Sequence, residues 1–246
     1  MPDGLDIILL LAGAFLAGIV TGLTGFGTAL TAMALWLYAI TPLLAAPLVA
    51  FCSLASHLYT VRKIWPDMDV RAALPFVLGG VLGIPAGVWL LTWMSADLFK
   101  LAVGVVLIGY PLFMLVARTP PVIADRGRGV ELAVGVASGL CGGFAGLSGP
   151  VLVVWSQLCR WSKQRARSIL QLINMVILGI AIVAYGVRGL VSVELLKLVV
   201  LCVPATVCGS WIGLRLYQRI DQDSFKRVVL ALLIASGLGL TLPRIL

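Results

Sequence analysis

Two stretches of the chain combine small residues with hydroxyl groups in a way that could bind a small solute. The first, residues 21–28, reads Thr-Gly-Leu-Thr-Gly-Phe-Gly-Thr, and the second, residues 138–150, begins Ser-Gly-Leu-Cys-Gly-Gly. Glycine costs about 1 kcal/mol relative to alanine inside a helix, so we expect each stretch to break its helix. A helix that restarts there presents unpaired N–H groups and the positive end of its dipole, which favour an anion. The two stretches together therefore predict an anion site.

The predicted binding residues are the small and polar members of these two stretches and polar residues in the segment that follows each of them. For any single glycine, the alternative is that it only allows helices to pack closely. For the polar residues outside the stretches, bridging between helices is an equal alternative. The full set is Thr21, Thr24, Gly25, Gly27, Thr28, Ser53, His57, Ser138, Cys141, Gly142, Gly146, Ser148, Gly149, Gln171 and Asn174.

The positions of the ionisable residues limit the charge that the substrate can carry. All ten acidic residues fall at the ends of apolar segments or between them. A proton pump or cation carrier usually places a carboxylate within the membrane, so their positions favour an anionic or neutral substrate. His57 is the only histidine, and it is either a proton partner or an interfacial side chain that is simply hydrogen-bonded.

The sequence predicts neither a metal site nor a cofactor nor an enzyme. The five cysteines lie in apolar segments without CxxC spacing, which argues against zinc and against a disulfide framework. There is no HExxH motif, no P-loop and no second histidine for a catalytic triad, so the usual catalytic templates are missing.

The elements that must position these residues are membrane-spanning helices. Of the 246 residues, 61% are hydrophobic and 11% are charged, and a soluble domain of this composition would expose a very large apolar surface. A spanning helix needs about 20 apolar residues. Such segments fill the chain, at about 5–40, 42–61, 72–94, 98–117, 130–159, 168–187, 194–216 and 226–243.

An internal repeat divides the eight segments into two sets of four. Gly83, Gly87 and Asp97 recur in register as Gly209, Gly213 and Asp223, and TGLTGFGTAL from position 21 resembles SGLCGGFAGLSGPVL from position 138. The fold class predicted is an all-α integral membrane protein of two inverted four-element repeats, each a glycine-broken helical hairpin followed by three transmembrane helices. It forms a single membrane domain, 1–246, with repeat one at 1–117, a linker at 118–129 and repeat two at 130–246.

The basic residues support the hairpins. If all eight segments were simple spans, nine Lys and Arg would lie on each side of the membrane, which does not fit the positive-inside rule. If segments one and five instead enter and leave on the same side, fourteen of the eighteen lie inside. The four outside are Lys100, Arg188, Lys197 and Arg244. Because these clusters lie between apolar runs, we read the net charge of +8 as a topology signal and predict no nucleic-acid partner.

At these residues the chain resembles the TauE/SafE family of sulfite exporters. The motifs that carry the resemblance are AGIVTGLTGFGTAL, ending at Leu30, and VGVASGLCGGFAGLSGPVLVVW, ending at Trp155. The likeness covers nearly the whole chain. Members of the family have about this length and two related halves. It implies transport of sulfite, a sulfonate or a related organosulfur anion across the bacterial inner membrane.

Together these observations predict a multi-pass secondary transporter or facilitator whose partners are a small sulfur-containing anion and the lipid bilayer. Export of an anion from a negative cytoplasm gains about 2.3 kcal/mol per charge for each 100 mV, so we expect flux driven by the membrane potential. Proton coupling through His57 is the lesser alternative. The competing function is a non-transporting membrane scaffold or assembly protein, and a homo-oligomer stays open.

Overall fold

The chain is all helical over the residues that its computed structural model describes, which are 4–61, 69–116, 127–216, 233–234, 237–238 and 241. Most of the predicted linker and most of the last predicted segment lie outside these residues. The described part contains nine helices and no strand. They are α1 (Gly4–Thr24), α2 (Thr28–Ala39), α3 (Pro42–Val61), α4 (Val70–Trp93), α5 (Ala96–Val116), α6 (Arg128–Ala145), α7 (Ser148–Leu158), α8 (Lys163–Val187) and α9 (Val193–Leu216).

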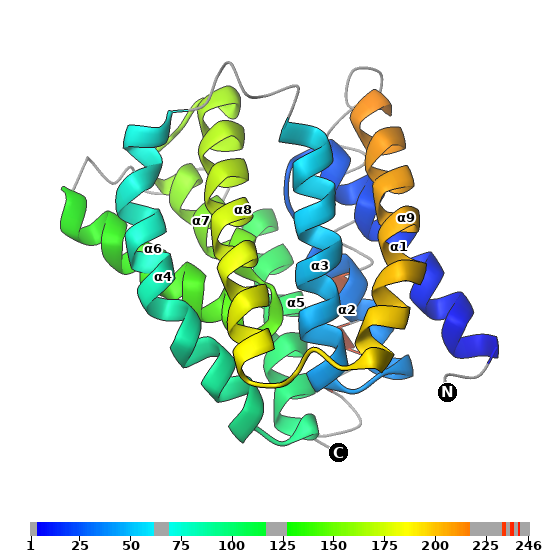
Figure 1. Cartoon of the computed structure of the whole chain (residues 1–246). Helices are drawn as coiled ribbons and strands as arrows, with labels where there is room; N and C mark the ends of the chain where they lie inside the picture. Colours follow the sequence, from blue (N-terminus) through cyan, green and yellow to red (C-terminus); the bar gives the residue numbers. More distant parts are fainter. Residues whose placement is uncertain are drawn as a thin grey trace.

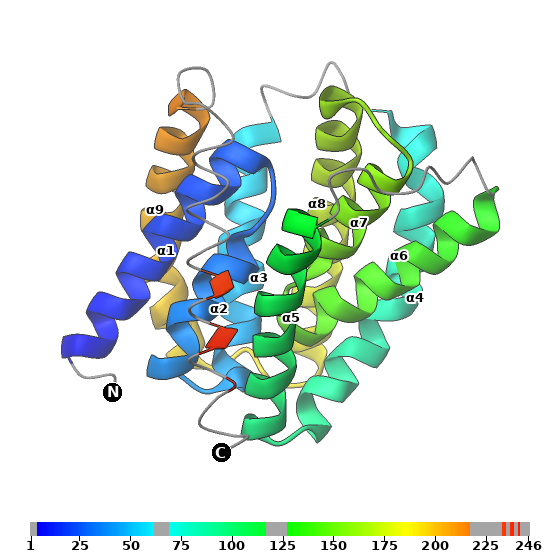
Figure 2. The ribbon, with the colours of Figure 1, turned by 180° about the vertical axis from the view of Figure 1, so that it is seen from behind.

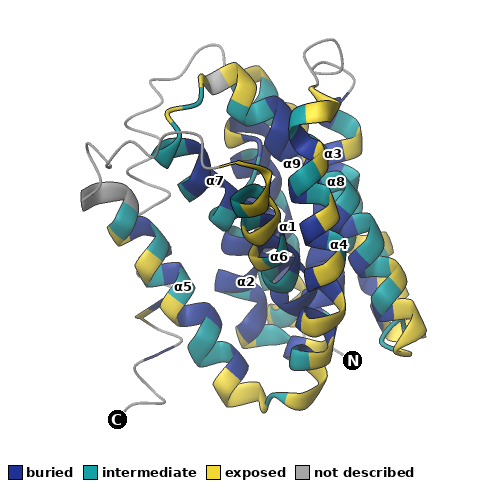
Figure 3. Ribbon diagram, turned by 90° about the vertical axis from the view of Figure 1, so that its left-hand side faces the viewer, coloured by how far each residue is buried: buried dark blue, intermediate teal, exposed yellow. Residues whose placement is uncertain are grey.

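Six of the described helices, α1, α3, α4, α5, α8 and α9, are long and apolar enough to cross a bilayer. Their outward faces carry large exposed apolar side chains, such as Leu82 at 66% and Val200 at 75% exposure. Figure 3 shows these exposed residues on the outside of the bundle and the buried ones facing its interior. Lipid is the solvent that makes such a surface favourable. The prediction of a multi-pass membrane protein is confirmed.

Segments one and five are each interrupted within their glycine-rich stretch. The α1–α2 turn contains Gly25 and Gly27, with φ of 81° and 99°, and the α6–α7 turn contains Gly146, with φ of 66°. Positive φ is strained for residues that have a Cβ atom, so glycine is what allows the chain to reverse. We call α1–α2 hairpin one and α6–α7 hairpin two (Figures 1 and 2). Hairpin one is unequal, because α1 has 21 residues and α2 has 12.

Each hairpin packs against a helix of the other half of the chain. Helix α1 lies along α9, and α6 lies along α4. Glycines make this packing close: a Cβ atom on Gly18 would meet the carbonyl oxygen of Thr206, and one on Gly139 would meet that of Gly80. Because neither backbone can yield to a side chain, these interfaces need glycine, in the manner of small-residue helix pairs in membranes.

The two interfaces repeat one pattern. Gly83 and Gly87 of α4 press on the backbone of α6, and Gly209 and Gly213 of α9 press on the backbone of α1. These are the glycines that the sequence pairs in register. The hairpins align differently from the sequence pairing of residue 21 with residue 138. By their contacts, Gly18, Gly22 and Gly25 correspond to Gly139, Gly143 and Gly146.

Helices α3 and α8 form the centre of the bundle. They pack on each other, α3 also packs on α9, and α8 also packs on α4. Helix α8 begins at Lys163, five residues before the predicted start, because Ser162 caps it by accepting from the backbone N–H of Arg165. In Figure 1 the two central helices stand between the hairpin of one half and the hairpin of the other.

Candidate functional site

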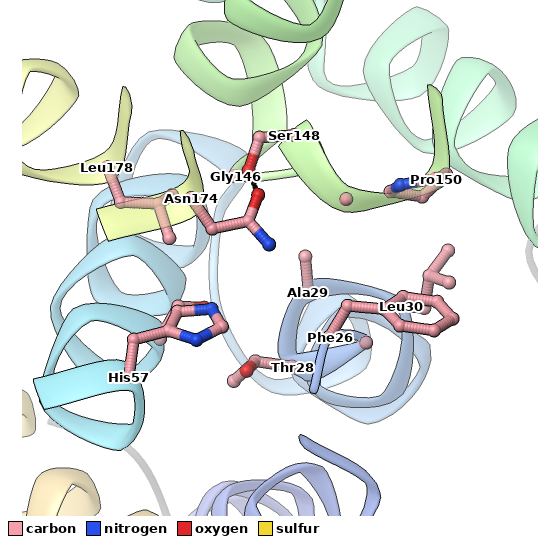
Figure 4. Close-up of a pocket in the computed structure, with 13 residues that line it drawn as sticks. Phe26, Thr28, Ala29, Leu30, His57, Gly146, Ser148, Pro150, Asn174 and Leu178 are labelled. Atoms are coloured by element: carbon pink, nitrogen blue, oxygen red, sulfur yellow. Dashed lines mark hydrogen bonds between the residues drawn. The ribbon is translucent and has the colours of Figure 1, made fainter. Parts of the chain in front are cut away.

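A small cavity lies where the tips of both hairpins meet the central helices. The empty space among the atoms that line it is about 260 Å³, with the adjoining open space included. The close-up in Figure 4 shows hairpin tips on one side of it and the side chains of α3 and α8 on the other. The residues that line it are Phe26, Gly27, Thr28, Ala29, Leu30, Ser53, His57, Gly146, Ser148, Gly149, Pro150, Asn174 and Leu178.

Two helix N-termini open onto this cavity. Helix α2 starts after Gly27 and α7 starts after Leu147, and neither start has a side-chain cap. The first-turn N–H groups of both helices therefore face the cavity rather than a capping oxygen, and the positive ends of two helix dipoles converge there. The two ends differ in one respect, because Pro150 in the first turn of α7 has no N–H to offer.

Hairpin two and α8 hold an amide group at the cavity wall. The Ser148 hydroxyl donates to Asn174 Oδ1 over 2.8 Å, and the Ser138 hydroxyl donates to the Ser148 carbonyl oxygen, also over 2.8 Å. With Oδ1 engaged, Asn174 directs its NH₂ group toward the cavity (Figure 4). All three residues are at most 2% exposed, so this network fixes a hydrogen-bond donor in a buried site.

A second network fixes the imidazole of His57. Gln171 Nε2 donates to the His57 carbonyl oxygen over 2.7 Å and to the Thr60 hydroxyl over 2.8 Å. A carbonyl oxygen only accepts, so this end of the amide must be the NH₂ group and the other end must be its oxygen. That oxygen, Oε1, lies 3.0 Å from His57 Nδ1. Nδ1 must therefore carry a hydrogen and donate it.

The tip of hairpin one is held by its own threonines. The hydroxyls of Thr21 and Thr28 lie 2.6 Å apart. The Thr24 hydroxyl lies 2.6 Å from the carbonyl oxygen of Phe26 and 2.9 Å from that of Val20. Thr21 and Thr24 therefore brace the turn from behind, and only Thr28 reaches the cavity.

The structure brings together eight of the fifteen predicted binding residues at the cavity wall: Gly27, Thr28, Ser53, His57, Gly146, Ser148, Gly149 and Asn174. The other seven do not line it. Of these, Gln171 orients His57, Ser138 supports Ser148, and Gly142 packs against Ile177 of α8. The remaining four, all in or beside the hairpin turns, are Thr21, Thr24, Gly25 and Cys141.

Sequence reasoning missed the apolar part of the wall, because it searched for polar and small residues. Phe26 is the clearest case, since its side chain packs edge to face on Tyr110 of α5, with ring centroids 6.1 Å apart, and would touch a Cβ atom placed on Gly149. Its position between two glycines was the available signal. The other missed residues are Ala29, Leu30, Pro150 and Leu178.

Helix α8 also binds the end of the first helix in each hairpin, which the sequence did not predict. Arg167 Nη2 donates to the carbonyl oxygen of Gly22 over 3.2 Å. Near the other end of α8, the Tyr185 hydroxyl donates to the carbonyl oxygen of Gly143 over 2.8 Å. Gly22 and Gly143 hold equivalent places in the two hairpins. The Arg167 bond and the Tyr185 bond therefore play the same role, each at one end of α8.

Comparison with known proteins relates the sequence of this chain to a described family. Residues 10–240 match the family model described as "Sulfite exporter TauE/SafE". A curated relative from Cupriavidus necator (strain ATCC 17699 / DSM 428 / KCTC 22496 / NCIMB 10442 / H16 / Stanier 337), named "Probable sulfite/organosulfonate exporter TauE", is 25% identical over 203 residues. That alignment covers 81% of this chain and 79% of the relative. No solved structure matches the chain significantly.

Proposed function

We propose, since this chain belongs to the sulfite exporter TauE/SafE family, that it is a secondary transporter or facilitator of small sulfur-containing anions. The substrate class comes from the name of the Cupriavidus necator relative. The proposed location is the bacterial inner membrane, and the proposed direction is export. In this proposal the anion occupies the cavity between the hairpin tips and is exposed alternately to the two sides.

The observation that carries the proposal is the convergence of positive dipoles and donors on one buried cavity. Two uncapped helix N-termini and the NH₂ group of Asn174 face it, and none of the described residues that line it is acidic. Backbone N–H groups at helix starts bind anions without a full positive charge nearby. Such a site holds an anion strongly enough to select it and weakly enough to release it.

The proposed mechanism uses two inverted repeats, 1–117 and 130–246, joined by the linker 118–129 within one membrane domain. The matching glycine interfaces of α4 with α6 and of α9 with α1 support the repeat. In Figure 1, hairpin one has its two outer ends in the lower half of the molecule, whereas hairpin two has its outer ends in the upper half. Rocking of one half against the other would expose the cavity to each side in turn.

The orientation follows the basic residues. Helices α4, α6 and α8 begin toward the upper edge in Figure 1, and α7 and α9 end toward the same edge. The described Lys and Arg at that edge are Arg71, Arg128, Arg160, Lys163, Arg165, Arg167 and Arg215, and those at the lower edge are Lys100, Arg188 and Lys197. The upper edge is therefore assigned to the cytoplasm. The negative cytoplasm then drives the anion outward.

The test is uptake of labelled sulfite into proteoliposomes under an imposed membrane potential, with sulfate and a short alkylsulfonate as competitors. We expect saturable flux that grows with a potential that is positive inside the vesicle. Flux no greater than in empty liposomes would contradict transport of this substrate and favour the scaffold function, for which the packing glycines such as Gly18 and Gly139 would suffice.

A single charge placed in the cavity sharpens the test. Asn174→Asp replaces the NH₂ donor by a carboxylate of nearly the same shape, and a buried like charge repels an anion. We expect the sulfite flux to fall at least about 100-fold, which corresponds to about 2.7 kcal/mol. The matched control is Gln164→Glu, which adds the same charge to the exposed first turn of α8 and should leave the flux within about twofold.

A further inference from the structure

We propose that the transported form is a hydrogen-bearing monoanion, hydrogensulfite rather than the sulfite dianion, and that the imidazole of His57 reads its hydrogen. This inference rests on the proposed function and specifies the substrate of the same site. It follows from the hydrogen-bond requirements of the wall, where one side-chain atom that can only accept is left without a partner among groups that donate or can donate.

The acceptor is Nε2 of His57. The Gln171 network requires a hydrogen on Nδ1, so in the neutral imidazole the other ring nitrogen is an acceptor. Among the described residues, no hydrogen bond reaches Nε2, and His57 lines the cavity while being only 2% exposed overall. In Figure 4 the ring faces the cavity from α3, beside the amide of Asn174.

The other polar groups of the wall are donors or can donate. They are the NH₂ group of Asn174, the first-turn N–H groups of α2 and α7, and the hydroxyls of Thr28 and Ser53. An anion that has only acceptor oxygens would satisfy all of these and leave Nε2 facing a lone pair. A buried acceptor without a partner costs about tenfold or more in binding. An oxyanion that carries one hydrogen pairs with Nε2 and with the donors together.

The charges around His57 agree with a single negative charge on the substrate. The Arg167 guanidinium of α8 acts electrostatically on the imidazole, and none of the described residues that line the cavity is charged at neutral pH apart from a protonated His57 itself. Arg167 is also bonded to the carbonyl oxygen of Gly22, outside the cavity wall. A dianion would thus enter a buried site that has no full positive charge in its wall, which is costly.

The number of charges moved per sulfur atom tests this directly. In proteoliposomes at equal pH on both sides, a monoanion accumulates at equilibrium by about 50-fold per 100 mV, whereas a dianion accumulates by about 2,500-fold. We expect the value for one charge, with flux that rises as the pH falls and the hydrogensulfite fraction grows. Two charges per sulfur with flux intact would overturn this inference alone, and absent flux would overturn the proposed function with it.

Methanesulfonate separates titration of the substrate from titration of the protein, because it is a monoanion that carries no acidic hydrogen. We expect wild-type flux of methanesulfonate to be about tenfold below that of hydrogensulfite and independent of pH near neutrality. In His57→Gln the amide of the new glutamine can turn its NH₂ group toward the cavity. The ratio of hydrogensulfite flux to methanesulfonate flux should therefore shrink to about threefold or less. Ser56→Ala is the control, because Ser56 bonds Ser210 of α9 and does not line the cavity.

The opposite result has a clear meaning. Methanesulfonate flux that rises in acid in the wild type, and loses that rise in His57→Gln, would show that His57 itself takes up the proton. The inference that the substrate brings the hydrogen would then be wrong. An unchanged preference in His57→Gln would equally contradict the role of Nε2.

Discussion

The two hairpins bring the same motif to the same cavity, but they secure it with different chemistry. In hairpin one the turn holds two glycines with positive φ, a charged Arg167 binds the end of α1, and the first turn of α2 keeps all its N–H groups. In hairpin two the turn holds one such glycine, a neutral Tyr185 binds the end of α6, and Pro150 removes one N–H. The comparison indicates that hairpin one keeps more backbone N–H donors at its second helix and is held by a charged side chain, whereas hairpin two keeps fewer and is held by a neutral one.

Alanine substitutions in the glycine interfaces should destabilise both hairpins to the same extent. We expect these substitutions to have the largest effect on the free energy of unfolding. Gly18→Ala and Gly139→Ala each drive a Cβ atom into a backbone carbonyl, so each should lower the free energy of unfolding by more than about 3 kcal/mol. Thermal unfolding in detergent measures it. Gly109→Ala is the control, because a Cβ atom there meets nothing within 4 Å. Sensitivity at one site alone would break the equivalence of the two interfaces.

The two hairpin turns should differ in how much stability an alanine substitution costs. Both glycines have positive φ, but a Cβ atom on Gly146 would lie 2.7 Å from Val49 Cγ1, whereas one on Gly25 would lie 3.3 Å from the flexible Arg167 side chain. We expect losses of about 2–3 kcal/mol at Gly146 and about 1 kcal/mol at Gly25. The same unfolding measurement applies. Equal losses would mean that the wall at hairpin two yields as readily as the side chain at hairpin one.

The two hydrogen bonds that α8 donates to the hairpins should differ in the stability they contribute, and the bond from the charged side chain should contribute more. Arg167→Met removes a charge-assisted bond to the Gly22 carbonyl oxygen, for about 1.5–3 kcal/mol, whereas Tyr185→Phe removes a neutral bond to the Gly143 carbonyl oxygen, for about 1 kcal/mol. Arg165→Met is the control for Arg167, because Arg165 is exposed and lies over the Trp161 ring. A larger loss for Tyr185→Phe would reverse the ranking of the two hairpins.

The smallest contrast concerns one tryptophan in the second helix of each hairpin. Trp36 Nε1 donates to the Leu10 carbonyl oxygen over 3.0 Å, whereas Trp155 Nε1, also buried, has no partner among the described residues. Trp36→Phe should therefore cost about 1 kcal/mol more than Trp155→Phe. Similar losses for the two variants would show that the Trp155 donor is satisfied in the folded protein.

Much of the fold was predictable because lipid imposes simple rules. Apolar runs of sufficient length located the spanning helices, and the glycine stretches located the breaks between α1 and α2 and between α6 and α7. The pairing of α1 with α9 and of α4 with α6 was not predictable, because glycine-rich faces are interchangeable in a sequence. The same ambiguity explains the shifted alignment of the hairpins, since a run such as Gly142–Gly143 fits several registers.

For the site, the sequence predicted residue types better than positions. His57, Asn174 and Ser148 stand out as polar side chains in apolar helices, and all three reach the cavity. Gln171 looks alike in the sequence, yet it lies behind His57 as a positioning residue. Which polar residue faces the cavity depends on helix rotation and on long-range bonds, and these cannot be derived from spacing within one helix.

The packing of α1 on α9 also fixes an order of assembly. Helix α1 is the first described helix to leave the ribosome, and α9 follows after nearly two hundred residues. Until then, Gly18 and Gly22 of α1 lack the α9 backbone against which they pack, and the contacts between α1 and α9 cannot form. Hairpin one must therefore enter the bilayer before its partner helix is made. A chain shortened before α9 would lack the packing of its N-terminal helix as well as its C-terminal residues.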